Sequence, residues 1–314
     1  MNRTRSQLMP MLVMASAGLM LAACTQEPSA SLTSAAATAA TTSPSGSSAA
    51  SVAPSADACA KESLNLVNAG NLTIGTDTPA YPPYFVTDDP AKQDAGDPAS
   101  GKGFESAVAY AVANHLGFTP EEVTWQVVPF NSSYAPGDKA FDFDINQISA
   151  TDKRKKVVDF SDGYYTVNQA VVALKDSPIA NVTSVAELKD ARLGAQVGTT
   201  SLDFISSVVQ PTNDVQVYND TNDAKHAMQN GQIDGLVVDL PTAFYITAVE
   251  IPKGKIVGQF TAQEGGEQFG MLFSKGNPLV ACVNTVLADM TASGELQSIQ
   301  DQWLAGDAAP YFTE

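Results

Sequence analysis

Apolar and polar positions alternate along residues 71–303 in a way that predicts short strands separated by helices. The apolar positions of 104–116 recur at helical spacing on one face, and Gly117 stands where a glycine commonly ends a helix. Short apolar runs between turn residues predict strands at 71–76, 123–128, 141–145, 192–197, 215–218 and 233–238. Further helices are predicted at 185–189, 201–209, 223–230, 278–288 and 294–303. This order indicates an α/β chain with mostly parallel sheets.

The length and charge of the chain narrow its organisation and its function. A length of 314 residues exceeds what one hydrophobic core usually serves, so we expect two lobes. The chain has 34 acidic and 17 basic side chains, and its formal net charge of −17 excludes nucleic-acid binding by phosphate neutralisation. Two histidines and three cysteines leave little material for a zinc site, and we expect neither a metal nor a cofactor.

Residues 1–23 have the pattern of an export signal. Arg3 and Arg5 precede an apolar stretch, 8–23, that is too short and too rich in alanine to predict a membrane span. The stretch ends in Leu-Ala-Ala before Cys24, which resembles the lipobox of bacterial lipoproteins. That resemblance implies cleavage before Cys24 and attachment of a diacylglycerol to its sulfur. The alternative is an ordinary secretory signal followed by an unrelated cysteine.

Residues 24–58 are predicted to form a disordered, lipid-anchored tether rich in Ala, Ser and Thr. The segment has few charges and no aromatic side chain, so it cannot bury enough surface to offset its conformational entropy. Beyond Cys24, the exported chain keeps Cys59 and Cys282. Cysteines outside the cytosol tend to pair, and we expect a disulfide between these two; the alternative is two separate buried thiols.

Polar and aromatic side chains follow the predicted strands, and ligands of open α/β sheets bind beyond the carboxyl ends of strands. They are Asp77, Tyr81 and Tyr84 after the first strand, Phe130 after the second, Asn146, Gln147, Ser149 and Arg154 after the third, Thr199 and Thr200 after the fourth and Asp239 after the last.

This set of side chains suits a zwitterion. Arg154 can bind a carboxylate through two parallel hydrogen bonds, and the helix that starts near Thr199 and Thr200 offers free N–H groups. Asp239 can accept hydrogen bonds from an ammonium group, and the aromatic side chains can wall an apolar slot. Each residue also has an ordinary alternative. Arg154 lies in a run of four basic residues that is typical of a solvated face, the threonines are typical N-caps, and Asp239 can cap a turn.

Seven segments stand in the order found in a known family. They are 73–84 (TIGTDTPAYPPY), 103–105 (GFE), 150–165 (ATDKRKKVVDFSDGYY), 193–200 (LGAQVGTT), 230–239 (NGQIDGLVVD), 269–277 (FGMLFSKGN) and 294–303 (GELQSIQDQW). Through them the chain resembles the polar amino-acid solute-binding proteins of ABC importers, solute-binding family 3, over nearly all of residues 62–305.

The resemblance implies a two-lobed periplasmic-binding-protein-like fold of type II, with the ligand in the cleft between the lobes. Lobe 1 would be 62–167 plus 269–314 and lobe 2 would be 168–268, with hinges at 168–170 and 267–269. The protein would be a monomeric lipoprotein, held by Cys24 on the outer face of the cytoplasmic membrane. It would not be an enzyme, and it would deliver a polar amino acid to ABC permease subunits.

The resemblance also assigns roles to the residues after the strands. Arg154 corresponds to the arginine that binds the α-carboxylate and Asp239 to the aspartate that binds the α-ammonium. The other correspondences are Thr199 and Thr200 with the helix-start carboxylate site, Gln147 and Ser149 with residues around both charged groups, Tyr81 and Phe130 with the aromatic pair around the ligand, and Asp77 and Gln196 with the positions that set selectivity.

Two departures from the family pattern affect the predicted cleft. The stretch after Asp77 is one residue longer than in many members, so Tyr81 becomes the aromatic wall, and 131–138 replaces the usual amphipathic helix. Asp77 gives a slight preference for ligands with hydrogen-bond donors, such as glutamine, arginine, lysine or histidine. Two other functions stay open: a dehydratase for cyclohexadienyl amino acids on the same fold, and a sensing module for a separate receptor.

Overall fold

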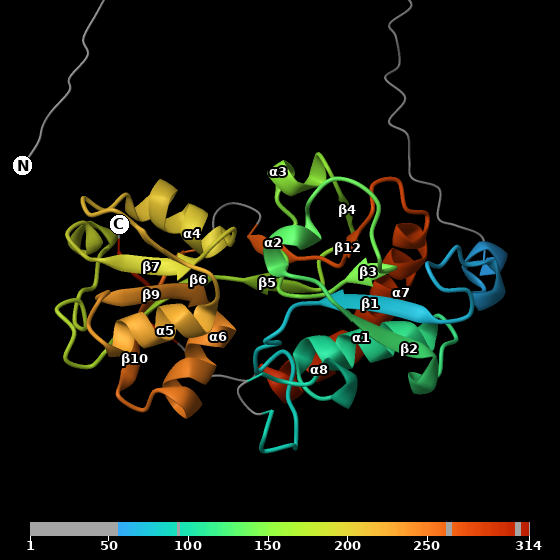
Figure 1. Ribbon diagram of the computed structural model, residues 1–314, viewed down its shortest axis with the longest axis horizontal. Helices are drawn as coiled ribbons and strands as arrows, with labels where there is room; N and C mark the ends of the chain where they lie inside the picture. The colour runs from blue at the N-terminus through green and yellow to red at the C-terminus, as the bar shows by residue number, and fades with distance from the viewer. Residues whose placement is uncertain (1–55, 93–94, 262–265, 305–308, 314) are drawn as a thin grey trace, which may run out of the picture. The chain divides into compact units, whose positions relative to one another are not determined.

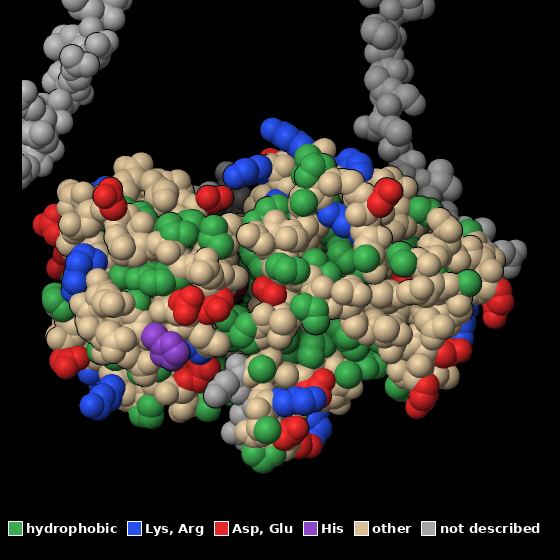
Figure 2. All heavy atoms as spheres, in the orientation of Figure 1, with side chains coloured by type: hydrophobic (Ala, Val, Ile, Leu, Met, Phe, Trp, Pro, Cys, Tyr) green, Lys and Arg blue, Asp and Glu red, His purple; other side chains and the backbone are tan. Residues whose placement is uncertain are grey.

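The structure, a computed structural model, describes residues 56–92, 95–261, 266–304 and 309–313 (Figure 1). The predicted signal peptide, Cys24 and the tether up to residue 55 lie outside the described residues. Within the described part of the chain, no helix has the length and apolar character needed to cross a membrane. Acidic, basic and apolar side chains are interspersed on the face drawn in Figure 2.

The first sheet has five strands in the order β2-β1-β3-β12-β4. β1 pairs in parallel with β2 and β3, whereas β12 is antiparallel to β3 and β4. Its apolar side chains form one core with helices α1, α7 and α8. The strands are β1 (Leu72–Thr76), β2 (Val123–Val127), β3 (Phe143–Asp144), β4 (Asp159–Phe160) and β12 (Leu272–Phe273), and the helices are α1 (Phe104–His115), α7 (Leu279–Ser293) and α8 (Glu295–Trp303).

The second sheet has five strands in the order β10-β6-β9-β7-β8. Val171 and Ala173 of β6 enter the core on one face, and Ala170 and Val172 enter the core on the other, as expected for a strand buried on both sides. The strands are β6 (Gln169–Leu174), β7 (Leu193–Gln196), β8 (Gln216–Tyr218), β9 (Gly235–Asp239) and β10 (Gly254–Gln259), and the flanking helices are α4 (Thr200–Phe204), α5 (Thr221–Gln229) and α6 (Leu240–Tyr245).

A two-stranded antiparallel sheet connects the two larger ones. It pairs β5 (Tyr165–Val167) with β11 (Glu267–Phe269). The chain enters the second sheet after β5 and returns to the first through β11 (Figure 1). Because of these two crossings, β6 and β12 are antiparallel to their neighbours. The predicted α/β class is confirmed, but the prediction of mostly parallel sheets is wrong.

Shorter elements complete the fold and refine the predicted helices. The segment that begins at Phe130 forms a helix of only four residues before the chain turns. The predicted helix at 185–189 is a 3₁₀ turn, and the one at 201–209 is α4 followed by a π-helical turn. The shorter elements are α2 (Phe130–Ser133), α3 (Asp152–Lys155), 3₁₀ turns Ala56–Cys59, Lys61–Ser63, Pro98–Ser100, Pro120–Glu122 and Val185–Leu188, and π turns Ile205–Val209 and Ile246–Glu250.

The predicted disulfide between Cys59 and Cys282 is present. It joins the first 3₁₀ turn to α7, across a sequence separation of 223 residues. The start of the described chain is therefore held covalently on the core of the first sheet.

The C-terminal residues 309–313 pack on the second sheet, so the predicted assignment of 269–314 to lobe 1 is wrong at its end. The backbone N–H of Gln259 donates to Pro310 O at 2.7 Å, and that of Phe312 donates to Gln259 O at 2.9 Å. The Phe312 ring is 6% exposed and packs on Phe260, with 4.9 Å between the ring centroids. Gly258 leaves the space for this ring, because a Cβ there would lie 2.8 Å from it.

We expect Phe312→Ala to lower the free energy of unfolding by about 3 kcal/mol or more, because it leaves a cavity in the core of the second sheet. The matched control is Tyr311→Ala at the neighbouring position, where the side chain is 58% exposed and the loss should stay below about 1 kcal/mol. Urea unfolding followed by circular dichroism measures both. Equal losses in the two variants would contradict this packing.

Candidate functional site

A cavity of about 60 Å³ lies where the carboxyl ends of β1, β7 and β9 meet. Of the eleven residues predicted to bind ligand, nine line it: Asp77, Tyr81, Phe130, Asn146, Gln147, Gln196, Thr199, Thr200 and Asp239. The two others, Ser149 and Arg154, lie beside it. Strand direction explains this gathering, since β1 is parallel to β2 and β3, and β7 is parallel to β9.

Asp77 follows β1 directly and connects the ends of two neighbouring strands. Its Oδ2 accepts a hydrogen bond from the backbone N–H of Phe130 at 3.0 Å, and its Oδ1 accepts from that of Thr78 at 2.7 Å. Burial raises the pKa of Asp77 above its usual value, although the two N–H groups oppose the rise. This places a negative charge on one wall of the cavity.

Asp239 is the last residue of β9 and forms another wall. Its Oδ1 accepts a hydrogen bond from Gln169 Nε2 at 2.7 Å. Burial, followed by the nearby charge of Glu267, raises the pKa of Asp239 well above its usual range. Thr199 and Thr200 face it from the start of α4, where Thr199 Oγ1 caps the helix by accepting from the backbone N–H of Leu202 at 3.2 Å.

Hydrogen bonds to Glu105 hold Gln147 at the cavity, next to Asn146. Gln147 has a left-handed backbone, with φ of 48°, and its backbone N–H donates to Glu105 Oε1 at 2.6 Å. The Gln147 side-chain amide and the Tyr164 hydroxyl also donate to the Glu105 carboxyl, and burial raises the pKa of Glu105 to about 7. Asn146 is 5% exposed, and among the described residues its Nδ2 has no hydrogen-bond acceptor.

Glu105 holds Gln147 at the cavity, a role that the sequence alone does not predict. Glu105 belongs to the family motif at 103–105, but that motif by itself predicts no role for it in the site. Its role becomes visible in three dimensions, because a helix-start glutamate at α1 accepts from a loop that follows β3.

Arg154 is buried beside the cavity, although the three lysines around it are exposed. Its guanidinium is 7% exposed and donates to Ser149 O at 2.8 Å and to Gly198 O at 3.0 Å. The guanidinium carbon lies 4.6 Å from the centre of the Tyr134 ring and 5.5 Å from that of Phe130. These contacts distinguish it from a residue on a solvated basic face, which was the ordinary alternative.

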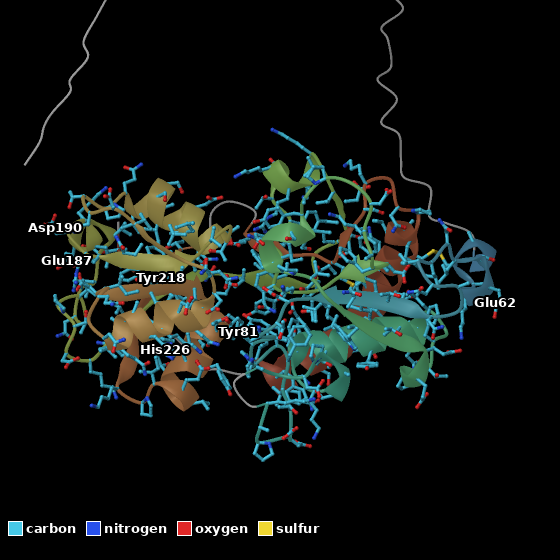
Figure 3. All side chains as sticks on the ribbon, viewed as in Figure 1. Glu62, Tyr81, Glu187, Asp190, Tyr218 and His226 are labelled. Atoms are coloured by element: carbon cyan, nitrogen blue, oxygen red, sulfur yellow. A yellow bond between two sulfur atoms is a disulfide. The ribbon has the colours of Figure 1, made fainter. Side chains whose placement is uncertain are left out.

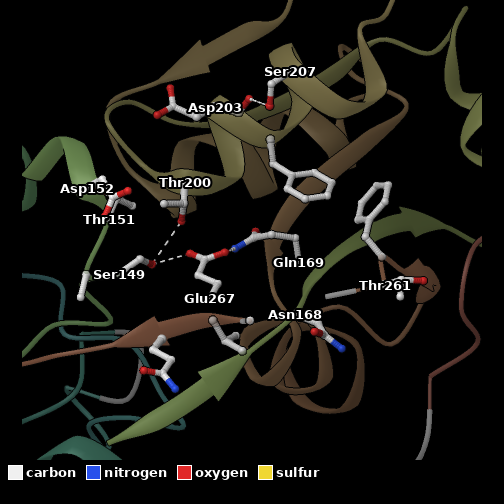
Figure 4. Close-up of a pocket in the computed structure, with 16 residues that line it drawn as sticks. Ser149, Thr151, Asp152, Asn168, Gln169, Thr200, Asp203, Ser207, Thr261 and Glu267 are labelled. Atoms are coloured by element: carbon white, nitrogen blue, oxygen red, sulfur yellow. Dashed lines mark hydrogen bonds between the residues drawn. The ribbon is translucent and has the colours of Figure 1, made fainter. Parts of the chain in front are cut away.

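Ser149 lines a second, larger pocket of about 520 Å³ (Figure 4). Its Oγ donates to the Glu267 carboxylate and lies 3.4 Å from Thr200 Oγ1. Ser149 and Thr200 line the second pocket together with Gln169 and Glu267. The two pockets therefore meet at a polar partition made from both sheets.

The aromatic residues divide between the cavity and the core. Tyr81 lines the cavity (Figure 3) and lies 5.7 Å from Lys225 Nζ, measured to its ring centre. Tyr84 is buried in the core of the first sheet, and its hydroxyl accepts from Thr242 Oγ1 at 3.3 Å. Its suggested place in the wall of an apolar slot is therefore wrong.

Known proteins resemble this chain in sequence and in fold. Residues 72–306 match the family described as bacterial extracellular solute-binding proteins, family 3. The L-cystine-binding protein TcyJ of Escherichia coli (strain K12) is 29% identical over 241 residues, which cover 76% of this chain and 84% of that protein. The arginine-binding extracellular protein ArtP of Bacillus subtilis (strain 168) is 28% identical over 209 residues, 65% of this chain and 78% of ArtP.

A solved structure shows the same fold. An ancestral arginine-binding protein bound to glutamine has a TM-score of 0.63 at 28% identity, and the match covers 76% of this chain and 99% of that one. The predicted two-lobed periplasmic-binding-protein fold of type II is thereby confirmed. Because the family pattern spans most of the sequence, the chain belongs to the bacterial extracellular solute-binding proteins of family 3.

Proposed function

We propose that this protein binds a polar amino acid in the cavity between β1, β7 and β9 and delivers it to an ABC permease. The observation that carries the proposal is the division of charge around the cavity. Asp77 and Asp239 present carboxylates to it, and the buried guanidinium of Arg154 lies at its edge with the start of α4. An amino acid carries both complementary charges. The related proteins are named for binding amino acids, which supports the same ligand class.

The ligand carboxylate is proposed to bind between Arg154 and the start of α4. Both hydrogen bonds recorded for the guanidinium go to carbonyl oxygens, which are neutral, so its positive charge stays available. Arginine has five N–H donors, and further ones remain for a ligand. The N–H groups of Thr200 and Ser201, at the start of α4, have no partner within the helix and favour an anion.

The ligand ammonium is proposed to bind Asp239, on the opposite side of the Ser149–Thr200 contact. The pKa of Asp239 is raised even though the charge of Arg154 lowers it, so an ammonium group there would further stabilise a buried carboxylate.

The ligand side chain would then extend toward Asp77 and Gln196. Asp77 favours ligand side chains that donate hydrogen bonds, so the candidates are glutamine, arginine, lysine and histidine. Cystine is a further candidate, because it carries a second ammonium group. An acidic side chain next to Asp77 would be costly.

The remaining assignments complete the proposal. Lobe 1 would comprise 62–167 and 269–304, and lobe 2 would comprise 168–268 and 309–313, with hinges at 168–170 and 267–269. The lipid on Cys24 would hold a monomeric protein at the outer face of the cytoplasmic membrane. Binding without catalysis is favoured because the named relatives are binding proteins.

We expect one or a few amino acids to raise the thermal unfolding temperature of residues 25–314 after bound material has been removed by unfolding and refolding. A ligand at about 100 times its dissociation constant adds about 2.7 kcal/mol to stability. Differential scanning calorimetry against the twenty amino acids and cystine measures this. Turnover of prephenate or arogenate, without any stabilising amino acid, would instead support the dehydratase.

Arg154→Ala and Asp239→Asn should each weaken binding of that amino acid at least about 30-fold, because each leaves a buried charge of the ligand without its partner. Arg154→Lys should fail similarly, since a lysine lacks the planar fork. The matched controls are Arg192→Ala and Asp234→Asn, which break an ion pair distant from the cavity lining. Calorimetric titration measures the affinities, and unchanged binding in Arg154→Ala would refute its role.

Binding should release protons and become tighter as the pH rises through the raised pKa of Asp239. An ammonium group beside Asp239 would lower that pKa, so the carboxyl would hold fewer protons in the complex than in the ligand-free protein. Titrations in two buffers of different ionisation enthalpy count the protons. The control is Asp142→Asn, which removes a carboxyl whose pKa is raised by burial outside the cavity lining and should leave the count unchanged. A count of zero in the unmodified protein would contradict the assignment.

A further inference from the structure

Glu267 lies on β11, one of the two strands that connect the sheets, and its carboxylate contacts residues from both sides (Figure 4). It accepts a hydrogen bond from the hydroxyl of Ser149, which follows β3 of the first sheet. It also accepts one from Gln169 Nε2 at 3.0 Å, at the start of β6 in the second sheet. The sequence had indicated only a hinge at 267–269.

Gln169 brings Glu267 and Asp239 together. Its Nε2 donates to Asp239 Oδ1 at 2.7 Å as well as to Glu267, so one amide nitrogen serves two carboxylates. The orientation of this amide is fixed, because its Oε1 accepts from Ser201 Oγ at 2.6 Å. Gln169 is 2% exposed, whereas Glu267 is half-buried and lines the second pocket.

Two carboxylates around one neutral amide repel each other, and a cation relieves that repulsion. Arg154 lowers the pKa of Asp239 and lies within electrostatic reach of Glu267, but its guanidinium donates its hydrogen bonds to the carbonyl oxygens of Ser149 and Gly198. An ammonium group has three donors, which is enough to reach more than one carboxylate oxygen. Asn146 lines the same cavity as Asp239, and its buried Nδ2 has no acceptor among the described residues, which independently indicates a ligand with an acceptor atom.

We propose that Glu267 is a second carboxylate for the ligand's α-ammonium and that it acts together with Asp239. It would make the site selective for ligands whose amino group is free and charged. Because Glu267 lies on a connecting strand and hydrogen-bonds with Ser149 and Gln169, ammonium binding there would also hold the two lobes in the closed arrangement. This inference rests on the proposed amino-acid function.

Glu267→Gln tests the proposal, because glutamine can keep both hydrogen bonds while losing the charge. Its Oε1 can accept from Gln169, and its Nε2 can donate to Ser149 Oγ. We expect calorimetric titration with the amino acid identified above to show affinity reduced at least about 10-fold. The same titration with the N-acetylated amino acid, which has no ammonium, should give equally weak binding to both proteins. Asp152→Asn is the matched control, since it removes another carboxylate from the second pocket and should change the affinity less than twofold.

The number of protons released on binding gives a second readout that a purely structural role would not move. Without the Glu267 charge the pKa of Asp239 falls, so Glu267→Gln should release fewer protons than the unmodified protein. If Glu267→Gln does not fold, Glu267→Asp, which keeps the charge on a shorter side chain, should bind more tightly than Glu267→Ala. Full affinity in Glu267→Gln together with lost affinity in Asp239→Asn would overturn this inference and leave the proposed function intact. If the unmodified protein bound no amino acid at all, the proposed function itself would fail.

Discussion

The amide nitrogen of Gln169 donates to the carboxylates of Asp239 and Glu267, and the charge balance of the whole site depends on this shared donor. Burial of Asp239, together with the nearby charge of Glu267, displaces the pKa of Asp239 upward. The carboxyl group is therefore prepared for a cation rather than satisfied by the protein. The opposite charge, on Arg154, is held in place by carbonyl oxygens and aromatic rings, which leave it positive.

The two crossings through β5 and β11 explain why these groups meet. Each larger sheet contributes side chains from the carboxyl ends of its parallel strands, and the crossings bring these two edges together. Glu267 and Gln169 stand at the crossings themselves, so their hydrogen bonds connect the strand pair to both edges. The C-terminal residues 309–313 add a further attachment of the chain to the second sheet, through Phe312.

Sequence reasoning could predict the residues that depend on local pattern and strand direction. Asp77, Thr199 and Asp239 follow apolar runs directly, and the rule that ligands bind at strand ends places them together without knowledge of the packing. It could not predict the contacts of Gln169, Glu267 or Phe312, because these contacts join segments that are far apart in the chain. In the sequence, Gln169 looks like any polar residue at the start of a strand. Phe312 looks like any aromatic residue near a chain end, and only the structure shows the space beside Gly258 that its ring fills.

The closed arrangement is held by bonds that a ligand must replace. Gly198 O accepts from Arg154 and from the Tyr134 hydroxyl, and Thr242 donates to Tyr84, so backbone and side chains of the second sheet contact the first on both sides of the cavity. A cavity of about 60 Å³ has room for about two water molecules, whereas an amino acid needs several times that volume. Ligand entry therefore requires these contacts to separate around β5 and β11. Under the proposed function, an amino acid bound to Arg154 and Asp239 would connect the two lobes again through its own charges.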